Sequence, residues 1–523
     1  MSDPSFNLWT SPWITVENAD GGLTTVSIET VLVNAHEFLA IYDPSPLVVV
    51  GIHRLLTAIL QDKLAPQHER DLAKLWESGQ FPRELIHEFG NEYGHRFDLF
   101  SLEEPFLQSA DLPLQWTKGE KPEPKSVATL FPEMPSGTMV THYQHGSEDE
   151  FILCPSCITK GLLMIPPFVT SGGPGLKPSI NGVPPIYVLP GGTTLFESIV
   201  ASLLLPTYQP EVRDIQNDSV WWKRKAFVNE KNESTQVGYT HSLLYPARRI
   251  RLHPQQTKNN CSKCGQLCEI GIRTMIFRMG ESRPKDAPFW FDPFAAYRLP
   301  DAESKSAKAQ TPTPIRPVEG RVLWREFAGL FLQNDRANTR QPSALKQIAD
   351  LIDQYQVADD ETPYPFRCVG MRTDMKAKIF EWIDVGFGVP PHLLQDPAGG
   401  VVVQAAIDFA ISCDGTLRRV FRQHFGGDGK EERRKQAKQE MSATFWRNLS
   451  GPFRGYIVQI VDPNTRDQVS KEWIDLVVTQ GIDTFRQATA TLGDSAATLQ
   501  QRVQGESHCR ASLHKLRNDW KGV

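Results

Sequence analysis

Two Cys-x-x-Cys pairs constrain this chain more than any other feature of its sequence. The first is Cys154-Pro-Ser-Cys157 and the second is Cys261-Ser-Lys-Cys264, and together they use four of the eight cysteines. Each pair can place two thiolates on one tetrahedral ion, and four soft thiolates favour zinc. We therefore expect one structural zinc ion per chain, with no open coordination position for catalysis, that holds the two ends of residues 158–260 together.

Three other interpretations of these cysteines stay open. One pair could be a redox motif of the thioredoxin type, although neither has the strand-to-helix setting of that motif in a βαβ unit. The thiols could be independent reduced core residues, and Cys268 could replace Cys264 as a ligand. A disulfide scaffold is excluded, because eight cysteines in 523 residues are too sparse for one.

The composition is that of an ordinary folded protein with a slightly acidic balance: 40% of residues are hydrophobic, 22% are charged and the net charge is −5. This argues against a disordered chain and against a wholly cationic nucleic-acid binder, although a few well-placed Lys and Arg can still contact phosphates. No apolar run approaches the roughly 18 to 20 residues that span a bilayer. The N-terminal Met-Ser-Asp-Pro has no signal-peptide pattern, so we expect a cytoplasmic protein outside the membrane.

Hydrophobic periodicity predicts an α+β fold, in which a large mixed, loop-rich N-terminal domain (1–390) with a zinc-ribbon-like four-cysteine site precedes a C-terminal four-helix bundle (391–523). The first domain is expected to contain strands at 13–16, 23–28 and 186–189, helices at 44–63 and within 69–89 with an interruption at Pro82, loops over most of 117–210, and an exposed connector at 301–317. The second is expected to contain helices at 401–425, 430–449, 473–492 and 499–520, the second of them ending before Gly451-Pro452.

A glycine-rich segment, residues 171–177 (Ser-Gly-Gly-Pro-Gly-Leu-Lys), follows the first cysteine pair. Gly172, Gly173 and Gly175 would let a ligand approach the backbone and would expose N–H groups to phosphate, with Lys177 as a neighbouring cation. The segment is no Walker A loop, because the Gly-Lys-Ser/Thr ending is missing. An ordinary turn-rich loop is the simpler interpretation of it.

Basic residues gather in four segments of this net-acidic chain. Residues 415–440 contain eight Lys or Arg against four Asp or Glu, a net of +4. Each basic segment is interpreted either as a solvated face or as part of a groove for nucleic-acid backbone. The other three segments are Lys223-Arg224-Lys225 beside Trp221 and Trp222, the trio Arg248, Arg249 and Arg251, and the trio Arg278, Arg283 and Lys285.

Signatures of catalysis are missing from the sequence. There is no His-Glu-x-x-His, no Gly-x-Ser-x-Gly and no Gly-x-Gly-x-x-Gly after a strand. We therefore expect a protein that is not an enzyme. The alternatives are a zinc-dependent hydrolase, assembled from distant residues such as His142, His145 and Asp374, and a zinc-stabilised scaffold that binds only protein.

The order of features along nearly the whole chain resembles one family, the CasA large subunits of the type I-E CRISPR surveillance complex Cascade, an antiviral defence complex. No single motif carries the resemblance; the collinear set does. The set comprises Phe6-Asn7-Leu8 with Pro12-Trp13-Ile14, Arg54-Leu55-Leu56, Glu104-Pro105-Phe106-Leu107-Gln108, the loop 131–142, both cysteine pairs, the glycine-rich segment, residues 238–252, residues 370–382 and the helical C-terminus.

The resemblance implies a nonenzymatic reader of double-stranded DNA. In this family the large subunit recognises the protospacer-adjacent motif (PAM) from the minor-groove side and helps to open the duplex, so that guide RNA held by other subunits can pair with it in an R-loop. It also recruits a helicase-nuclease. The family's glycine-rich loop is matched by Gly172, Gly173 and Gly175, followed by Lys177. Its basic finger is best matched by Arg278, with Arg283 and Lys285 as alternatives.

A wedge hairpin and a docking loop complete the set that the resemblance implies. The wedge residues are Arg372, Thr373, Asp374, Met375 and Lys376. The family's glutamine is absent here, so Met375 or Lys376 would occupy the tip. The residues of the loop that docks near the 5′ end of the guide are Ser136, Gly137, Thr138 and Met139. The C-terminal bundle resembles the part that contacts the small subunit and the displaced strand. Because minor-groove readout is degenerate, we expect promiscuous use of PAMs.

Overall fold

The structure is a computed structural model of the chain. It describes residues 4–114, 123–131, 134, 151–171, 175–211, 218–224, 236–300, 311–333, 338–373, 379–426, 432–493 and 495–520. The chain divides into two compact units, which are described separately. The first is Met1–Ala295 with Pro342–Val357 and Pro365–Gly386, and the second is Ala296–Gln341 with Ala358–Tyr364 and Phe387–Val523. The predicted domain boundary near residue 390 stays a prediction.

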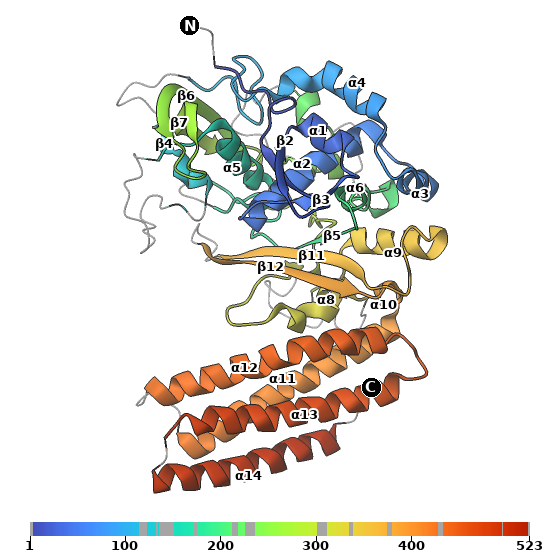
Figure 1. The fold of residues 1–523 in the computed structure, drawn as a ribbon, viewed down its shortest axis with the longest axis vertical. Helices are drawn as coiled ribbons and strands as arrows, with labels where there is room; N and C mark the ends of the chain where they lie inside the picture. Colours follow the sequence, from blue (N-terminus) through green and yellow to red (C-terminus); the bar gives the residue numbers. More distant parts are fainter. Residues whose placement is uncertain are drawn as a thin grey trace. The chain divides into compact units, whose positions relative to one another are not determined.

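The first unit begins with a small antiparallel sheet in the order β2–β1–β3, followed by helices (Figure 1). Helix α2 is apolar on nearly all sides, which is typical of a helix buried in a core. It contacts α5 (Pro155–Phe168), α6 (Leu195–Val200) and α7 (Tyr239–Leu243). The elements are β1 (Ile14–Asn18), β2 (Leu23–Val26), α1 (Ile28–Val33), β3 (Phe38–Ile41), α2 (Pro46–Leu64), α3 (Glu69–Ser78) and α4 (Arg83–Tyr93). The predicted strands and helices of this region are confirmed, including the interruption at Pro82, which caps α4.

Two more three-stranded sheets lie in the rest of this region, in the orders β4–β7–β6 and β12–β11–β5. Strands β6 and β7 form a long antiparallel hairpin whose turn carries the second cysteine pair, and α5, which begins at the first pair, contacts β7 (Figure 1). The elements are β4 (Lys125–Ser126), α5 (Pro155–Phe168), β5 (Tyr187–Pro190), α6 (Leu195–Val200), α7 (Tyr239–Leu243), β6 (Arg248–Asn260), β7 (Leu267–Met279), α9 (Ser343–Tyr355), β11 (Tyr364–Thr373) and β12 (Ile379–Val389).

Helix α5 corrects the expectation of loops over most of residues 117–210. It runs for 14 residues although Pro166 and Pro167 lie within it. Both prolines fall in the last turn, and most of the side chains of the helix are buried. Tertiary burial here outweighs the low helix propensity of proline. The strand predicted at 186–189 is confirmed by β5.

The second unit contains a small sheet in the order β10–β8–β9 and four long helices. Helix α11 contacts α12, α13 and α14, and α13 also contacts α12 and α14. The elements are β8 (Tyr297–Arg298), β9 (Thr313–Pro314), α8 (Phe327–Phe331), β10 (Thr339–Arg340), α10 (Pro391–Leu394), α11 (Pro397–Phe425), α12 (Glu432–Gln459), α13 (Arg466–Ala490) and α14 (Ala496–Asp519). The prediction of a mixed α+β chain with a helical C-terminal region is confirmed. Of the predicted connector 301–317, residues 301–310 lie outside the described part.

The predicted end of a helix before Gly451-Pro452 is wrong, because α12 continues through Pro452 to Gln459. Proline removes one backbone N–H from the helix. The helix continues because its next turn is anchored by aromatic packing: Phe453 is buried and stacks on Trp324 with 4.5 Å between ring centroids.

Helix α11 is long and apolar enough, by length and composition alone, to cross a membrane. Half of its most apolar window is buried inside the protein. A core helix passes the same test, so this is weak evidence for a membrane span.

Candidate functional site

The four cysteines of the two pairs meet in the first unit. Their Sγ atoms all lie within 4.8 Å of one another, and those of Cys154 and Cys264 are 3.8 Å apart. Cys154, Cys157 and Cys261 are buried and Cys264 is exposed. Four soft thiolates at this spacing fit one tetrahedral metal ion.

Local backbone structure presents these thiols. Cys154 caps the N-terminus of α5, and its Sγ accepts a hydrogen bond from the N–H of Cys157 at 3.5 Å. In the second pair, Gly265 has a φ of +74°, which glycine adopts without a steric penalty, and its N–H donates to the Cys261 carbonyl at 2.9 Å. Ser262 joins the two pairs, because its N–H donates to the Ile152 carbonyl at 2.8 Å and its Oγ accepts from the Ile152 N–H at 3.0 Å.

The thiols influence one another's ionisation. Hydrogen bonds from the side chains of Cys154 and Cys157 lower the pKa of Cys261 well below its usual value. The side-chain hydrogen bonds of Cys157, first with Cys154 and then with Cys261, raise the pKa of Cys157. One member of the cluster is thus favoured as a thiolate, the form that binds metal.

The structure brings Cys264, and not Cys268, to the other three cysteines. Cys268 is buried nearby, where its Sγ donates to the Asn259 carbonyl at 3.2 Å and burial raises its pKa.

The glycine-rich segment ends against the chain that follows the β6–β7 hairpin. The backbone N–H of Lys177 donates to Sδ of Met279 at 3.2 Å, and Nζ of Lys177 donates to Oγ of Ser282 at 3.3 Å. Gly175 is described, with a φ of +79°, whereas Gly172 and Gly173 lie outside the described residues. The segments after the two cysteine pairs therefore meet at Lys177.

The three candidates for a basic finger differ in position. Arg278 pairs with Arg249 in the β6–β7 ladder, and strand alternation places it on the opposite face from Met279, which contacts Lys177. Arg283 is half-buried and donates to the Pro288 carbonyl. Lys285 is exposed in a turn closed by a hydrogen bond from the Ala287 N–H to the Pro284 carbonyl.

The hairpin of β11 and β12 carries the predicted wedge. Nε of Arg372 lies 2.9 Å from Oε1 of Glu381, which links the two strands next to the tip, and Thr373 is the last residue of β11. Other predicted residues lie outside the described part of the chain: Asp374, Met375 and Lys376 of the tip, Ser136, Gly137, Thr138 and Met139 of the docking loop, and the histidines His142 and His145.

The arginine trio on β6 corrects the interpretation of these residues as a solvated face or an open groove. Arg248, Arg249 and Arg251 are all buried. Chain segments cover them, since Arg249 forms an ion pair with Asp111 and Nη2 of Arg251 donates to the Leu102 carbonyl at 3.2 Å.

The basic segment next to Trp222 is ion-paired where it is described. Nζ of Lys223 lies 2.6 Å from Oδ1 of Asp62, and Nη1 of Arg224 lies 3.5 Å from Oε2 of Glu281. In the basic segment 415–440, Arg419 and Arg422 are exposed on α11.

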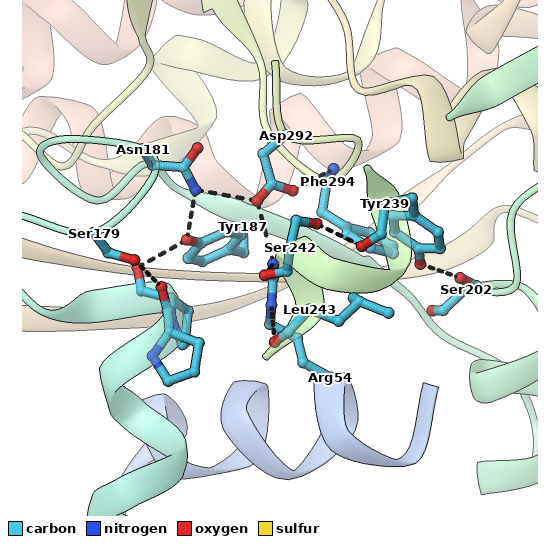
Figure 2. A network of polar contacts seen from close by, with 12 residues as sticks. Arg54, Ser179, Asn181, Tyr187, Ser202, Tyr239, Ser242, Leu243, Asp292 and Phe294 are labelled. Atoms are coloured by element: carbon cyan, nitrogen blue, oxygen red, sulfur yellow. Dashed lines mark hydrogen bonds and ion pairs between the residues drawn. The ribbon is translucent and has the colours of Figure 1, made fainter. Parts of the chain in front are cut away.

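Arg54 and Asp292 form the centre of a buried polar network. No sequence pattern indicated this network. Nη1 of Arg54 lies 3.2 Å from Oδ2 of Asp292, and the two side chains are 2% and 0% exposed. Figure 2 shows Arg54 extending from α2 between Asp292 and α7, where it donates to the carbonyls of Ser242 at 3.0 Å and Leu243 at 3.3 Å. Each of the three guanidinium nitrogens therefore has a hydrogen-bond partner, and such bonds offset part of the cost of burying an ion pair.

The same network reaches both flanks of the glycine-rich segment. Nδ2 of Asn181 donates to Asp292 at 3.1 Å and to the Tyr187 hydroxyl at 3.0 Å, and that hydroxyl donates to the Pro167 carbonyl at 2.8 Å (Figure 2). Oγ of Ser179 donates to the Pro166 carbonyl. The chain entering the segment and the chain leaving it are therefore tied to one core.

Comparisons with known proteins are consistent over the whole chain. Residues 7–483 match the model of a family described as CRISPR-associated protein Cse1. The chain is 27% identical over 540 aligned residues to the CRISPR-associated protein CasA/Cse1 of Thermus thermophilus, with 98% of both chains covered. In fold it is similar to Cse1 from Acidimicrobium ferrooxidans, with a TM-score of 0.77, 21% identity and 99% of both chains covered. It is also similar to a chain of a CRISPR RNA-guided surveillance complex, with a TM-score of 0.71 and 17% identity, covering 98% of this chain and 100% of that one.

Proposed function

The chain belongs to the CRISPR-associated Cse1 family, and we propose that it is the large subunit of an RNA-guided surveillance complex of the Cascade type. In this role it recognises the PAM in double-stranded DNA, helps to open the duplex for the guide RNA, and recruits a helicase-nuclease. The observation that carries the proposal is the contact of Lys177, at the end of the glycine-rich segment, with Met279 and Ser282. This contact brings the described end of the glycine-rich segment next to the segment in which the basic finger is expected.

The DNA-reading surface combines backbone N–H groups with cations. Minor-groove edges differ little among base pairs, so glycine N–H groups and a lysine can read them without a strict sequence requirement. We assign these roles to Gly172, Gly173 and Gly175, with Lys177 beside them. Lys285 is the preferred finger, ahead of Arg278, because it is exposed on a turn close to Ser282, which contacts Lys177.

The wedge and the docking loop complete the nucleic-acid contacts. The Arg372–Glu381 contact braces the β11–β12 hairpin next to its tip, where Met375 or Lys376 would part the first base step. The loop Ser136–Gly137–Thr138–Met139 would dock near the 5′ end of the guide RNA, on an adjoining subunit.

The cysteine cluster is proposed to hold one structural zinc ion. Four thiolates fill a tetrahedral site, so the ion would supply a cross-link and no open position for substrate. This donor set supports a protein that is not an enzyme. Cys154, Cys157, Cys261 and Cys264 would keep the segments after both pairs in place.

Helices α11 to α14 are proposed to act as one antiparallel four-helix bundle that contacts the small subunit and the displaced DNA strand. Their mutual contacts and the exposed Arg419 and Arg422 support this role. The complex would work in the cytoplasm.

The proposal is tested in the complex reconstituted with guide RNA and the other subunits. The measured quantity is the ratio of affinities for a matched duplex with a PAM and the same duplex without one. We expect Gly173→Asp and Lys285→Ala to lower this ratio about fivefold or more. Lys74→Ala, which removes an exposed lysine of α3, is the matched control and should leave the ratio unchanged. An unchanged ratio in both test variants would contradict the proposal and favour a scaffold.

Degenerate readout also predicts tolerance among PAMs. Binding to duplexes with every single-base change in the PAM should vary by less than about 2 kcal/mol per base. A single motif preferred by more than this at each base would contradict minor-groove reading by glycine N–H groups.

A further inference from the structure

Arg248 is a buried cation whose partners are almost all main-chain carbonyls. It is 4% exposed, and no carboxylate within the described residues pairs with it. Nη2 donates to the Thr170 carbonyl at 2.7 Å, and Nη1 donates to the carbonyls of Lys177 and Ala247, also at 2.7 Å. One guanidinium therefore bridges the residue just before the glycine-rich segment and the last residue of it.

Arg248 stays charged at neutral pH although its surroundings disfavour the charge. Its Cζ lies 5.6 Å from the centroid of Phe277, and Nζ of Lys125 lies 5.3 Å from the same ring, so two cations share one aromatic side chain. Burial lowers the pKa of Arg248 to about 10, which leaves the guanidinium protonated at neutral pH. A buried charge without a counter-ion is costly, and the three carbonyl bonds of Arg248 offset part of that cost.

We infer that Arg248 is a positioning residue for PAM recognition, because its fork closes the base of the glycine-rich segment and holds Lys177 against Met279 and Ser282. The inference rests on the proposed function. A second hydrogen bond joins the chain before and after the glycine-rich segment, because the N–H of Ser179 donates to the Val169 carbonyl at 3.0 Å. Fixing the described residues at both ends of the segment would lower the ordering cost of binding DNA.

The positioning role of Arg248 depends on the geometry of its guanidinium group and not on its charge alone. An arginine guanidinium presents donors in a planar array that can reach two carbonyls in fixed directions, whereas a lysine ammonium is a point charge on a flexible stem. Arg248→Lys keeps the charge and loses the bridge. Arg248→Met loses both.

Arg251 provides a matched control on the same strand. It is 2% exposed, and it too has no carboxylate partner among the residues that the structure describes. Its register partner is Ile276, so it lies on the opposite face of the sheet from Arg248, where its Nη2 donates to the Leu102 carbonyl. Arg251→Met removes a buried arginine of the same kind without touching the glycine-rich segment.

The test combines two measurements on Arg248→Met, Arg248→Lys and Arg251→Met. In the full-length chain without DNA, amide hydrogen exchange over residues 168–181 should become about tenfold faster in both Arg248 variants and stay unchanged in Arg251→Met. In the reconstituted complex, the ratio of affinities with and without a PAM should fall about fivefold in both Arg248 variants and stay unchanged in Arg251→Met.

Two results would overturn the inference: an Arg248→Lys variant that behaves like the wild type, or an Arg251→Met variant that loses PAM discrimination as Arg248→Met does. Gly173→Asp separates this failure from that of the proposed function. If Gly173→Asp and Lys285→Ala both leave the ratio unchanged, the proposed function itself fails. If Gly173→Asp lowers the ratio and the Arg248 variants do not, only the role of Arg248 fails.

Discussion

Two polar centres of the first unit connect parts of the chain around the glycine-rich segment in different ways. The cysteine cluster brings together four like side chains, two from each local pair, in an arrangement compatible with one metal ion. The Arg54–Asp292 network joins unlike groups from α2, α7 and the chain around Asn181, and these groups donate hydrogen bonds to one another or accept them (Figure 2). With the proposed metal ion, the first centre would depend on a ligand that can be withdrawn, whereas the second uses only groups of the chain itself. The comparison teaches that segments far apart in the sequence can be joined either by side chains suited to an added ion or by side chains that satisfy one another.

The largest effect is expected from emptying the cysteine cluster. Chelation or Cys157→Ser should lower the free energy of unfolding of the first unit by at least about 5 kcal/mol, because the binding free energy of a structural metal is folding free energy. Metal content per chain and urea unfolding followed by tryptophan fluorescence measure this.

Cys268→Ser is the matched control for the cluster. Cys268 lies outside the four-ligand group, and a serine hydroxyl could donate to the Asn259 carbonyl as the thiol does. The variant should retain its metal and lose less than about 1 kcal/mol. A Cys157→Ser variant with full metal content and full stability would show that the cysteine cluster does not depend on a metal ion held by Cys157.

The next largest effect is expected from breaking the ion pair in the second centre. Arg54→Met leaves the Asp292 carboxylate buried without its counter-ion, which should cost about 3–5 kcal/mol in the free energy of unfolding. Arg367→Met is the control, because the Arg367–Asp384 pair is 35% and 38% exposed and should be worth less than about 1 kcal/mol. Equal losses of unfolding free energy in the two variants would show that the buried ion pair contributes no more to stability than the exposed one.

The cysteine centre could be predicted from the sequence and the Arg54–Asp292 network could not. Cysteine pairs show their ligand geometry within four residues, and few residue types bind metal as thiolates. Arg54 and Asp292 are 238 positions apart, and neither residue type is normally buried. Charge spacing alone does not show which basic residues are covered, so the trio on β6 was placed at the surface although Arg248 and its neighbours are buried.

The coarse fold and the family could be predicted because both depend on patterns that extend over the whole chain. The family resemblance is confirmed by the match of residues 7–483. Local rules failed where packing outweighs propensity, at Pro166 in α5 and at Pro452 in α12. The strands of the β6–β7 hairpin were also missed, since their polar ends, such as Gln255-Gln256, do not alternate like a half-buried strand.

A smaller, pH-dependent effect would sharpen the description of the second centre. His53 lies next to Arg54 and its Nε2 is 2.8 Å from Oγ of Ser202. Burial, and then the nearby charges of Arg54 and Arg367, lower the pKa of His53 to about 4. His53 therefore binds a proton more readily in the unfolded state than in the folded state. Its contribution to the free energy of unfolding is fully present above the unfolded pKa of 6.5 and is lost as the pH falls from there toward the folded pKa of about 4.

The expected loss is about 2 kcal/mol of unfolding free energy between pH 7 and pH 5. Urea unfolding at the two pH values measures it, and His53→Gln should reduce the difference by that amount. The same pH dependence in wild type and variant would show that another group titrates.

The smallest effect is expected at Ser179, which links the second centre to the glycine-rich segment. Ser179→Ala removes one hydrogen bond, to the Pro166 carbonyl, and should cost about 1 kcal/mol in the free energy of unfolding. Its local effect should be larger than its global one, because the Ser179 N–H still donates to the Val169 carbonyl while the side-chain tie to the end of α5 is lost. Amide exchange over residues 168–181 should therefore rise in Ser179→Ala while exchange in α2 stays unchanged. If exchange rises equally in both places, the network and the segment open as one unit, and the second centre cannot be separated from the fold that it stabilises.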